Sequence, residues 1–128
     1  MRLLADTCTF LWLVGNPEKL SAAAREALSD SANLIFLSVI SDWEITLKIS
    51  SGGLEWFQDP EVRVPYWRNH FGIQTLPLDE RSALHLSKLP HIHRDPFDRM
   101  LVCQAMTHRM VLVTPDESIR KYPVSVLW

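Results

Sequence analysis

Short, largely apolar segments alternate with helix-forming segments along this chain, and this alternation is the feature that most restricts its fold. Five such apolar segments stand out in the sequence, at residues 2–5, 34–37, 73–76, 110–113 and 124–127. Strands that are buried on both faces read as short apolar runs of this kind. We therefore expect a parallel sheet that helices cover on both faces.

The segments between these strands have helical periodicity or are rich in good helix formers. They are TFLWLV, SAAAREALSD, SVISDWEITLKIS, DERSALHLSKL and DPFDRMLVCQAMTH, and several begin with Ser or Asp, which are preferred N-cap residues. The sequence thus predicts a three-layer α/β/α domain around a mainly parallel sheet of about five short strands. Residues 51–72 are less regular because glycines, Pro60 and Pro65 interrupt them, so we expect a protruding loop and a short helix there.

Length and composition limit the classes of protein that this chain can belong to. Its 128 residues, 47% of them hydrophobic, suffice for one compact domain, which we place at 1–128. A net charge of -2 lacks the electrostatic footprint of a protein that coats DNA, so any contact with nucleic acid must be local. The spacing of Cys8 and Cys103 suggests neither a disulfide framework nor a zinc site. Without a leader-like or bilayer-spanning segment, we expect a cytoplasmic protein with no membrane contact.

Four acidic residues occupy positions that point to one edge of the predicted sheet. Asp6 directly follows the first strand and Asp116 follows the fourth, and ligands of open parallel sheets bind beyond these carboxyl ends. Glu44 lies at the margin of the apolar face of the 38–50 helix. Asp98 lies in the first turn of the helix that Asp95 begins.

Each acid also has a purely structural explanation when it is considered alone. Asp95 is well placed to cap its helix, and Glu44 can pair with Lys48 one turn later or complete a capping box. Asp6 and Asp116 can be turn residues or caps, and an acid in the first turn of a helix complements the helix dipole. None of these acids therefore defines a site on its own.

Taken together, four carboxylates at one edge would repel one another unless a cation lay among them. Because oxygen ligands select hard divalent cations, we expect Mg²⁺ or Mn²⁺ in preference to zinc. The histidines of the HIH run, His91 and His93, are expected to be structural or to make weak RNA contacts.

Four stretches of the sequence resemble PIN-domain proteins, specifically the VapC-type toxins of bacterial toxin-antitoxin pairs. They are LLADTCTFLWL, SVISDWEITLKISSGGL, LSKLPHIHRDPFDRMLVCQA and LVTPDESIRKYPVSVLW, which together span nearly the whole chain. Similar proteins often have His after the DT pair, where this chain has Cys8, and residues 54–72 match no motif.

The resemblance implies a PIN-like domain that acts as a Mg²⁺- or Mn²⁺-dependent endoribonuclease. The acidic quartet of the family corresponds here to Asp6, Glu44, Asp98 and Asp116, and Asp95 matches a frequent companion. We expect Asp6 and Asp98 to be the principal metal ligands, with Glu44 and Asp116 completing the site directly or through water. The metal would activate water and neutralise charge as an RNA phosphodiester is hydrolysed.

Other residues near these acids are expected to support them. The hydroxyls of Thr7 and Thr114 could hydrogen-bond carboxylates or phosphate, although both residues could equally be turn residues. Arg94 and Arg99 are candidates for contacts with the RNA backbone, because a guanidinium matches phosphate geometry, and solvated surface charge is the alternative for them.

The resemblance also implies a cognate antitoxin, whose tail wraps the toxin and presents a basic residue to the acidic site. The chain carries more aromatic and aliphatic side chains than a small core needs, at Trp12, Leu13, Trp56, Phe57, Tyr66 and Trp67. An amphipathic helix could bind to those that are exposed. The alternatives are that they fill the core or form a homodimer contact, so we expect either a homodimer or a toxin-antitoxin hetero-oligomer.

Two other classes of protein compete with the nuclease. A phospho-acceptor receiver domain also places aspartates at strand ends, but it has an adjacent acidic pair after the first strand and a lysine after the last, and this chain has neither. A non-catalytic binding module of similar architecture is harder to distinguish from the nuclease, because a sequence reveals candidate metal ligands but does not reveal whether the protein catalyses a reaction. The presence of all four acids favours the enzyme.

Overall fold

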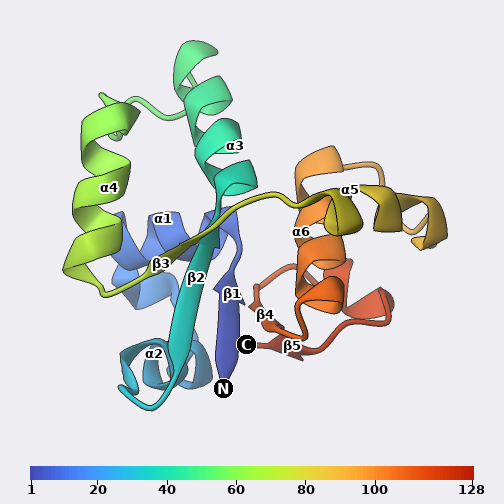
Figure 1. Cartoon of the computed structure of the whole chain (residues 1–128). Coiled ribbons are helices and arrows are strands. Elements are labelled where there is room, and N and C mark those ends of the chain that lie inside the picture. Colours follow the sequence, from blue (N-terminus) through green and yellow to red (C-terminus); the bar gives the residue numbers. More distant parts are fainter.

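The computed structural model describes residues 1–128 and contains one five-stranded sheet (Figure 1). The strands are β1 Arg2–Ala5, β2 Leu34–Ser38, β3 Gln74–Leu76, β4 Val111–Val113 and β5 Val126–Leu127. Their order is β3-β2-β1-β4-β5, and each neighbouring pair is parallel. The predicted sheet is confirmed, and all of its pairs are parallel.

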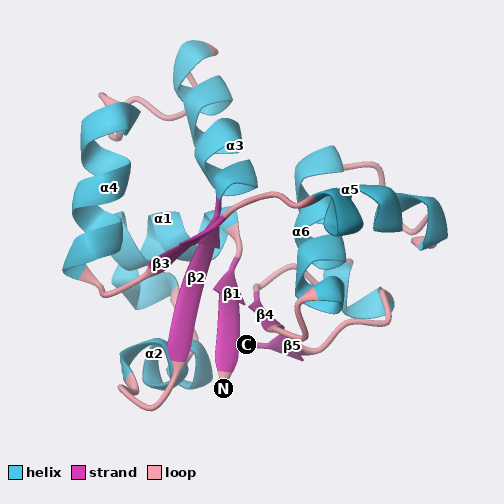
Figure 2. Ribbon diagram, in the orientation of Figure 1, coloured by secondary structure: helices cyan, strands magenta, loops and turns pink.

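Six α-helices surround the sheet (Figure 2). They are α1 Thr7–Gly15, α2 Ala22–Ser29, α3 Val39–Ser50, α4 Pro60–His70, α5 Glu80–His85 and α6 Pro96–Thr107. Short 3-10 turns occur at Pro17–Lys19, Leu86–Lys88 and Ile119–Lys121. The N-cap side chains that begin α1, α2, α3 and α6 accept backbone N–H bonds, and the caps are Asp6, Ser21, Ser38 and Asp95. None of the helices combines the length and the apolar character that crossing a bilayer requires.

Successive strand residues point to opposite faces of the sheet and enter two separate cores. Leu3 packs in a core with side chains of α1, α2 and α4, whereas its neighbour Leu4 packs in a core with α6. Helix α3 contributes to both, with Ile45 in the first core and Ile40 in the second. Figure 1 shows α1, α2 and α4 on one side of the sheet and α5 and α6 on the other. The three-layer α/β/α architecture is confirmed.

The loop and the helix predicted at 51–72 are both present, but the segment packs onto the core instead of protruding. The segment contains the 11-residue helix α4, and its Phe57 and Val64 are buried in the first core. Pro60 stands at the start of α4, where its missing N–H costs no helical hydrogen bond. Pro65 does remove an internal donor, and the burial of the adjacent Val64 offsets this cost.

This arrangement predicts that Phe57→Ala destabilises the protein by about 3–5 kcal/mol, because it opens a cavity at a fully buried position. Tyr66→Ala is the aromatic control, since Tyr66 is 61% exposed and packs edge-on against Trp67. Tyr66→Ala should lower the free energy of unfolding by no more than about 1.5 kcal/mol. Urea denaturation of the two variants measures the difference, and equal costs would contradict the packing of this segment into the core.

Candidate functional site

Asp6 is fixed at the carboxyl end of the central strand β1. Its backbone N–H donates to the carbonyl of Val113 on β4 at 3.1 Å, and its Oδ1 accepts the N–H of Thr9 at 2.7 Å. The side chain thereby caps α1, while the residue is only 3% exposed. Burial raises the pKa of Asp6, although hydrogen bonds from Thr114 and Thr9 lower it in part. The carboxylate is therefore held in one orientation in a poorly solvated place.

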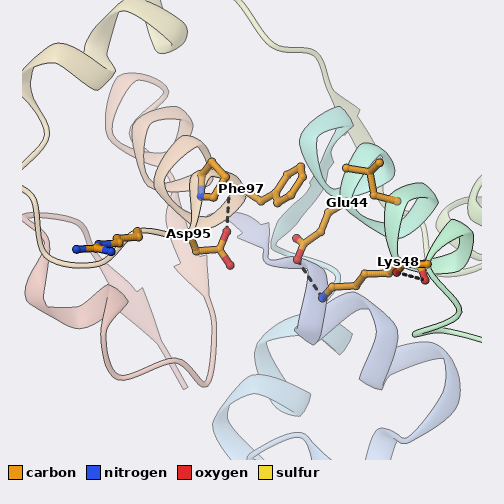
Figure 3. Close-up of a pocket in the computed structure, with 8 residues that line it drawn as sticks. Glu44, Lys48, Asp95 and Phe97 are labelled. Atoms are coloured by element: carbon orange, nitrogen blue, oxygen red, sulfur yellow. Dashed lines mark hydrogen bonds and ion pairs between the residues drawn. The ribbon is translucent and has the colours of Figure 1, made fainter.

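Glu44 on α3 is buried, and its two oxygens differ in what they contact. Its Oε2 lies 3.0 Å from Lys48 Nζ, so the predicted pairing one turn apart does form. Its Oε1 is buried and has no hydrogen-bond partner. A buried acceptor left without a donor costs about 1–3 kcal/mol. Glu44 therefore combines a structural ion pair with a free oxygen that a ligand would satisfy (Figure 3).

Asp95 and Asp98 have different roles at the start of α6. Asp95 is the N-cap, and its Oδ1 accepts the N–H groups of Phe97 at 2.9 Å and of Asp98 at 3.1 Å. Pro96 occupies the first helical position, where no N–H is needed. The predicted capping role of Asp95 is confirmed. With its backbone held in this way, Asp98 lies in the first turn with its carboxylate free of the cap.

The pKa of Asp98 is raised by burial and by the negative charges of neighbouring acids. Burial and the charges of Asp95, Asp6, Glu44 and Asp116 raise its pKa to about 7. Each of these neighbours disfavours the ionised form by repulsion. Three acids predicted from separate parts of the sequence, Asp6, Glu44 and Asp116, thus act on Asp98 in the folded chain.

Asp116 approaches the same place from the end of β4. Its backbone N–H donates to Thr114 Oγ1 at 3.1 Å, and its Oδ1 accepts the N–H of Ser118 at 2.8 Å. Ligand atoms of Asp116, Asp98 and His93 all lie within 4.8 Å of one another. Three segments far apart in the sequence therefore present donors to one small volume.

His93 lies beside these acids, although the sequence analysis expected it only to be structural or to make weak RNA contacts. Its Nε2 is buried without a hydrogen-bond partner and lies 3.5 Å from Asp98 Oδ2. Its Nδ1 lies 2.6 Å from the Tyr122 hydroxyl. The available signal was its position two residues before the N-cap Asp95, which places it beside the first turn of α6.

The threonines and the cysteine near Asp6 have distinct surroundings. Thr7 is buried and its hydroxyl donates to Ser41 Oγ at 2.9 Å, which joins α1 to α3. Thr114 is fully buried, and its hydroxyl lowers the pKa of Asp6 by hydrogen bonding. Burial and the charge of Asp6 raise the pKa of Cys8 to about 11, so its thiol stays protonated near neutral pH.

The two arginines expected to contact RNA lie in different environments. Arg99 is buried, and its Nη1 donates to the carbonyl of Pro90 at 2.8 Å and to the Tyr122 hydroxyl at 3.1 Å. Because this guanidinium is occupied inside the protein, Arg99 is not free to make the RNA contact expected of it. Arg94 is exposed and lines a cleft beside the acids.

That cleft lies between α3 and the start of α6, and its volume is about 670 Å³. Figure 3 shows Glu44 and Lys48 on one wall facing Asp95 and Phe97 on the other. The eight lining residues are Glu44, Leu47, Lys48, Ser51, Arg94, Asp95, Pro96 and Phe97. The cleft therefore gives an open approach to the acidic edge of the sheet.

Fold and site together define an α/β protein with acidic side chains gathered at the carboxyl edge of a parallel sheet. A family model described as the PIN domain matches residues 3–124, and the chain belongs to this family. A comparison with curated protein sequences finds no match.

Solved structures with the same fold include several complexes. A chain of VapBC2 from Rickettsia felis, bound to a DNA fragment from its promoter, is 14% identical with a TM-score of 0.71. A chain of DNA-bound VapBC from Salmonella typhimurium is 19% identical with a TM-score of 0.70, and one of VapBC-1 from nontypeable Haemophilus influenzae is 19% identical with a TM-score of 0.65. The alignments cover 98% of this chain and 97%, 96% and 96% of the three others, respectively.

The raised pKa of Asp98 predicts how stability depends on pH in the absence of metal. The folded protein keeps a proton on Asp98 up to about pH 7, whereas the unfolded chain releases it near the ordinary pKa of 3.8. The contribution of Asp98 to stability therefore falls as the pH rises from about 4 to about 7. We expect Asp98→Asn to match the wild type near pH 4 and to exceed it by at least about 1 kcal/mol at pH 8.

Urea denaturation in EDTA at pH 4, 6 and 8 measures this difference. Glu117→Gln removes an exposed acid nearby and controls for the change in net charge. A gain for Asp98→Asn that does not grow with pH would contradict the crowding of carboxylates around Asp98.

Proposed function

We propose that this protein is a metal-dependent endoribonuclease of the VapC type, the toxin of a toxin-antitoxin pair. The observation that supports the proposal is the raised pKa of Asp98, on which the charges of Asp6, Glu44 and Asp116 act, together with the close approach of Asp98 and Asp116 in a PIN-domain chain. Acids that raise the pKa of Asp98 to about 7 are poorly accommodated without a cation. The adjoining cleft supplies the access that a polymeric substrate needs.

The chemistry of the donors fits Mg²⁺ or Mn²⁺. The four acids offer oxygen ligands, which hard divalent cations prefer. The unpartnered Oε1 of Glu44 and the carboxylate of Asp98 would regain favourable interactions with a bound cation. Asp6 and Asp98 would be the principal ligands, and Glu44 and Asp116 would bind directly or through water. The bound ion would supply Lewis acidity and lower the pKa of a water molecule.

The protein side chains would supply orientation and proton transfer. Thr9 and Thr114 keep the Asp6 carboxylate in place through hydrogen bonds. A carboxylate oxygen not engaged by the ion would accept the proton of the attacking water. Arg94, exposed at the cleft, would pair with an RNA phosphate.

We predict that the purified protein cleaves RNA in the presence of Mg²⁺ or Mn²⁺ and that cleavage stops in excess EDTA. Asp6→Asn and Asp98→Asn should each lower the rate by more than about 100-fold, because even outer partners of metal ligands cost about 10–100-fold. Asp95→Asn is the matched control, since Asn caps a helix about as well as Asp. It should retain most of the activity.

A gel assay on a labelled RNA, with circular dichroism to check folding, decides among these outcomes. Cleavage that persists in EDTA would refute the metal mechanism. Metal binding without any cleavage would favour a non-catalytic binding module.

The partner implied by the proposal is a cognate antitoxin. Solved structures of similar fold include VapBC complexes and FitAB bound to a DNA fragment. In this chain Phe57 fills the core, but Trp43, Trp56 and Tyr66 remain exposed by 58%, 44% and 61%. Trp43 packs edge-on against Phe97 at the cleft, with ring centroids 5.2 Å apart. An antitoxin helix with apolar side chains would match this aromatic surface, and a following basic residue would match the acids around Asp98 beside the cleft.

We expect the chain alone to arrest growth when it is expressed, and a small DNA-binding protein encoded beside it to relieve the arrest. The two proteins should co-purify as a hetero-oligomer, and the complex should not cleave RNA. Trp43→Ala should weaken the complex, because aromatic anchors contribute much of the affinity of an interface. A neighbour that neither binds nor protects would remove the toxin assignment and leave the nuclease assignment standing.

A further inference from the structure

The hydroxyl of Tyr122 stands at the centre of a buried hydrogen-bond network beside the acids. Tyr122 is 3% exposed and Arg99 is 8% exposed, so water does not compete for these bonds. The hydroxyl oxygen lies 3.1 Å from Arg99 Nη1 and 3.2 Å from the backbone nitrogen of His93. It also lies 2.6 Å from Nδ1 of the His93 ring.

The number of donors around this oxygen determines where its proton goes. An arginine N–H and a backbone N–H can only donate, and together they occupy both lone pairs of the hydroxyl. The hydroxyl proton must then be donated to His93 Nδ1, which accepts it. In the neutral ring the remaining proton therefore lies on Nε2.

We propose that His93 is a positioning residue of the metal site, whose Nε2–H orients the Asp98 carboxylate. Nε2 has no other partner and lies 3.5 Å from Asp98 Oδ2, so a small movement of either group completes the hydrogen bond. This role rests on the proposed function, because Asp98 is a ligand only if the site binds metal. Tyr122 and Arg99 act in turn on His93 by selecting its tautomer.

The same network argues against His93 as a direct metal ligand. A ligating Nε2 needs its lone pair, so the ring proton would have to move to Nδ1. Nδ1–H would then face a hydroxyl oxygen that already accepts two N–H groups and whose own proton would lose its acceptor. The network therefore stabilises a donor at Nε2 and disfavours a ligand there.

Imidazole ¹⁵N NMR at a pH where the ring is neutral reads the tautomer directly. We expect an Nε2–H signal for His93, assigned by its loss in His93→Gln, both in EDTA and after saturation with Mg²⁺. Tyr122→Phe should remove the preference for this tautomer. An Nδ1–H tautomer in the wild type, or loss of the Nε2 proton on adding Mg²⁺, would overturn the proposal.

Calorimetric titration with Mn²⁺ tests the action on Asp98 without any RNA. His93→Leu should lower the affinity by about 10–100-fold, as the loss of a ligand's hydrogen-bond partner does. His93→Gln, which can place an amide N–H near the position of Nε2, should restore affinity to within about threefold of the wild type. Thermal unfolding of both variants shows whether they fold.

Unchanged affinity in a folded His93→Leu protein would overturn the role of His93 alone. A wild-type protein that binds no Mn²⁺ and cleaves no RNA would overturn the proposed function and this role with it.

Discussion

The pairing of β1 with β4 in the middle of the sheet is the contact on which the rest of the site depends. The two strands run parallel with Leu3 opposite Val111 and Ala5 opposite Val113, and the Asp6 N–H extends the ladder to Val113. Parallel strands end at the same edge, so this register brings the residue after β1 level with the turn after β4. Backbone geometry therefore places Asp6 and Asp116 at the same edge of the sheet, before any interaction between side chains is considered.

Repulsion among the acids has to be balanced by the structure around them, and the balancing groups are ordinary structural ones. The Thr9 amide, the cap at Asp95 and the Lys48 ammonium each hold a backbone or a carboxylate near its neighbours. Burial of apolar side chains in the two cores stabilises the fold and offsets the repulsion among the carboxylates. Strain of this kind concentrates at functional sites because a ligand can relieve it.

The features that could be predicted from sequence are those that depend on local pattern. Apolar runs marked the strands, and the DPF turn separated Asp95 as a cap from Asp98 inside the helix. His93 escaped prediction because its role depends on Tyr122, which lies 29 residues later in the chain. Arg99 was misjudged for a similar reason, since nothing local shows that its charge is buried against Pro90 and Tyr122.

The segment around helix α4 shows that glycines and prolines in a sequence do not by themselves indicate a protruding segment. Pro60 begins the helix and Pro65 lies inside it, and neither prevents its formation. Burial of Val64 and Phe57 in the first core outweighs the local preference. Tertiary packing decided this element, and packing is not visible in a short window of sequence.

The separation of the site residues along the chain also has a consequence in time. During synthesis Asp6 is made about a hundred residues before β4, and β1 cannot pair with β4 until residues 111–113 have been made. Contacts between such distant segments form late, because closing the long loop between them costs entropy before the contacts contribute any favourable free energy. No partly synthesised chain that lacks Asp116 possesses the complete cluster, so whatever chemistry this edge performs begins only after residue 116 has been made.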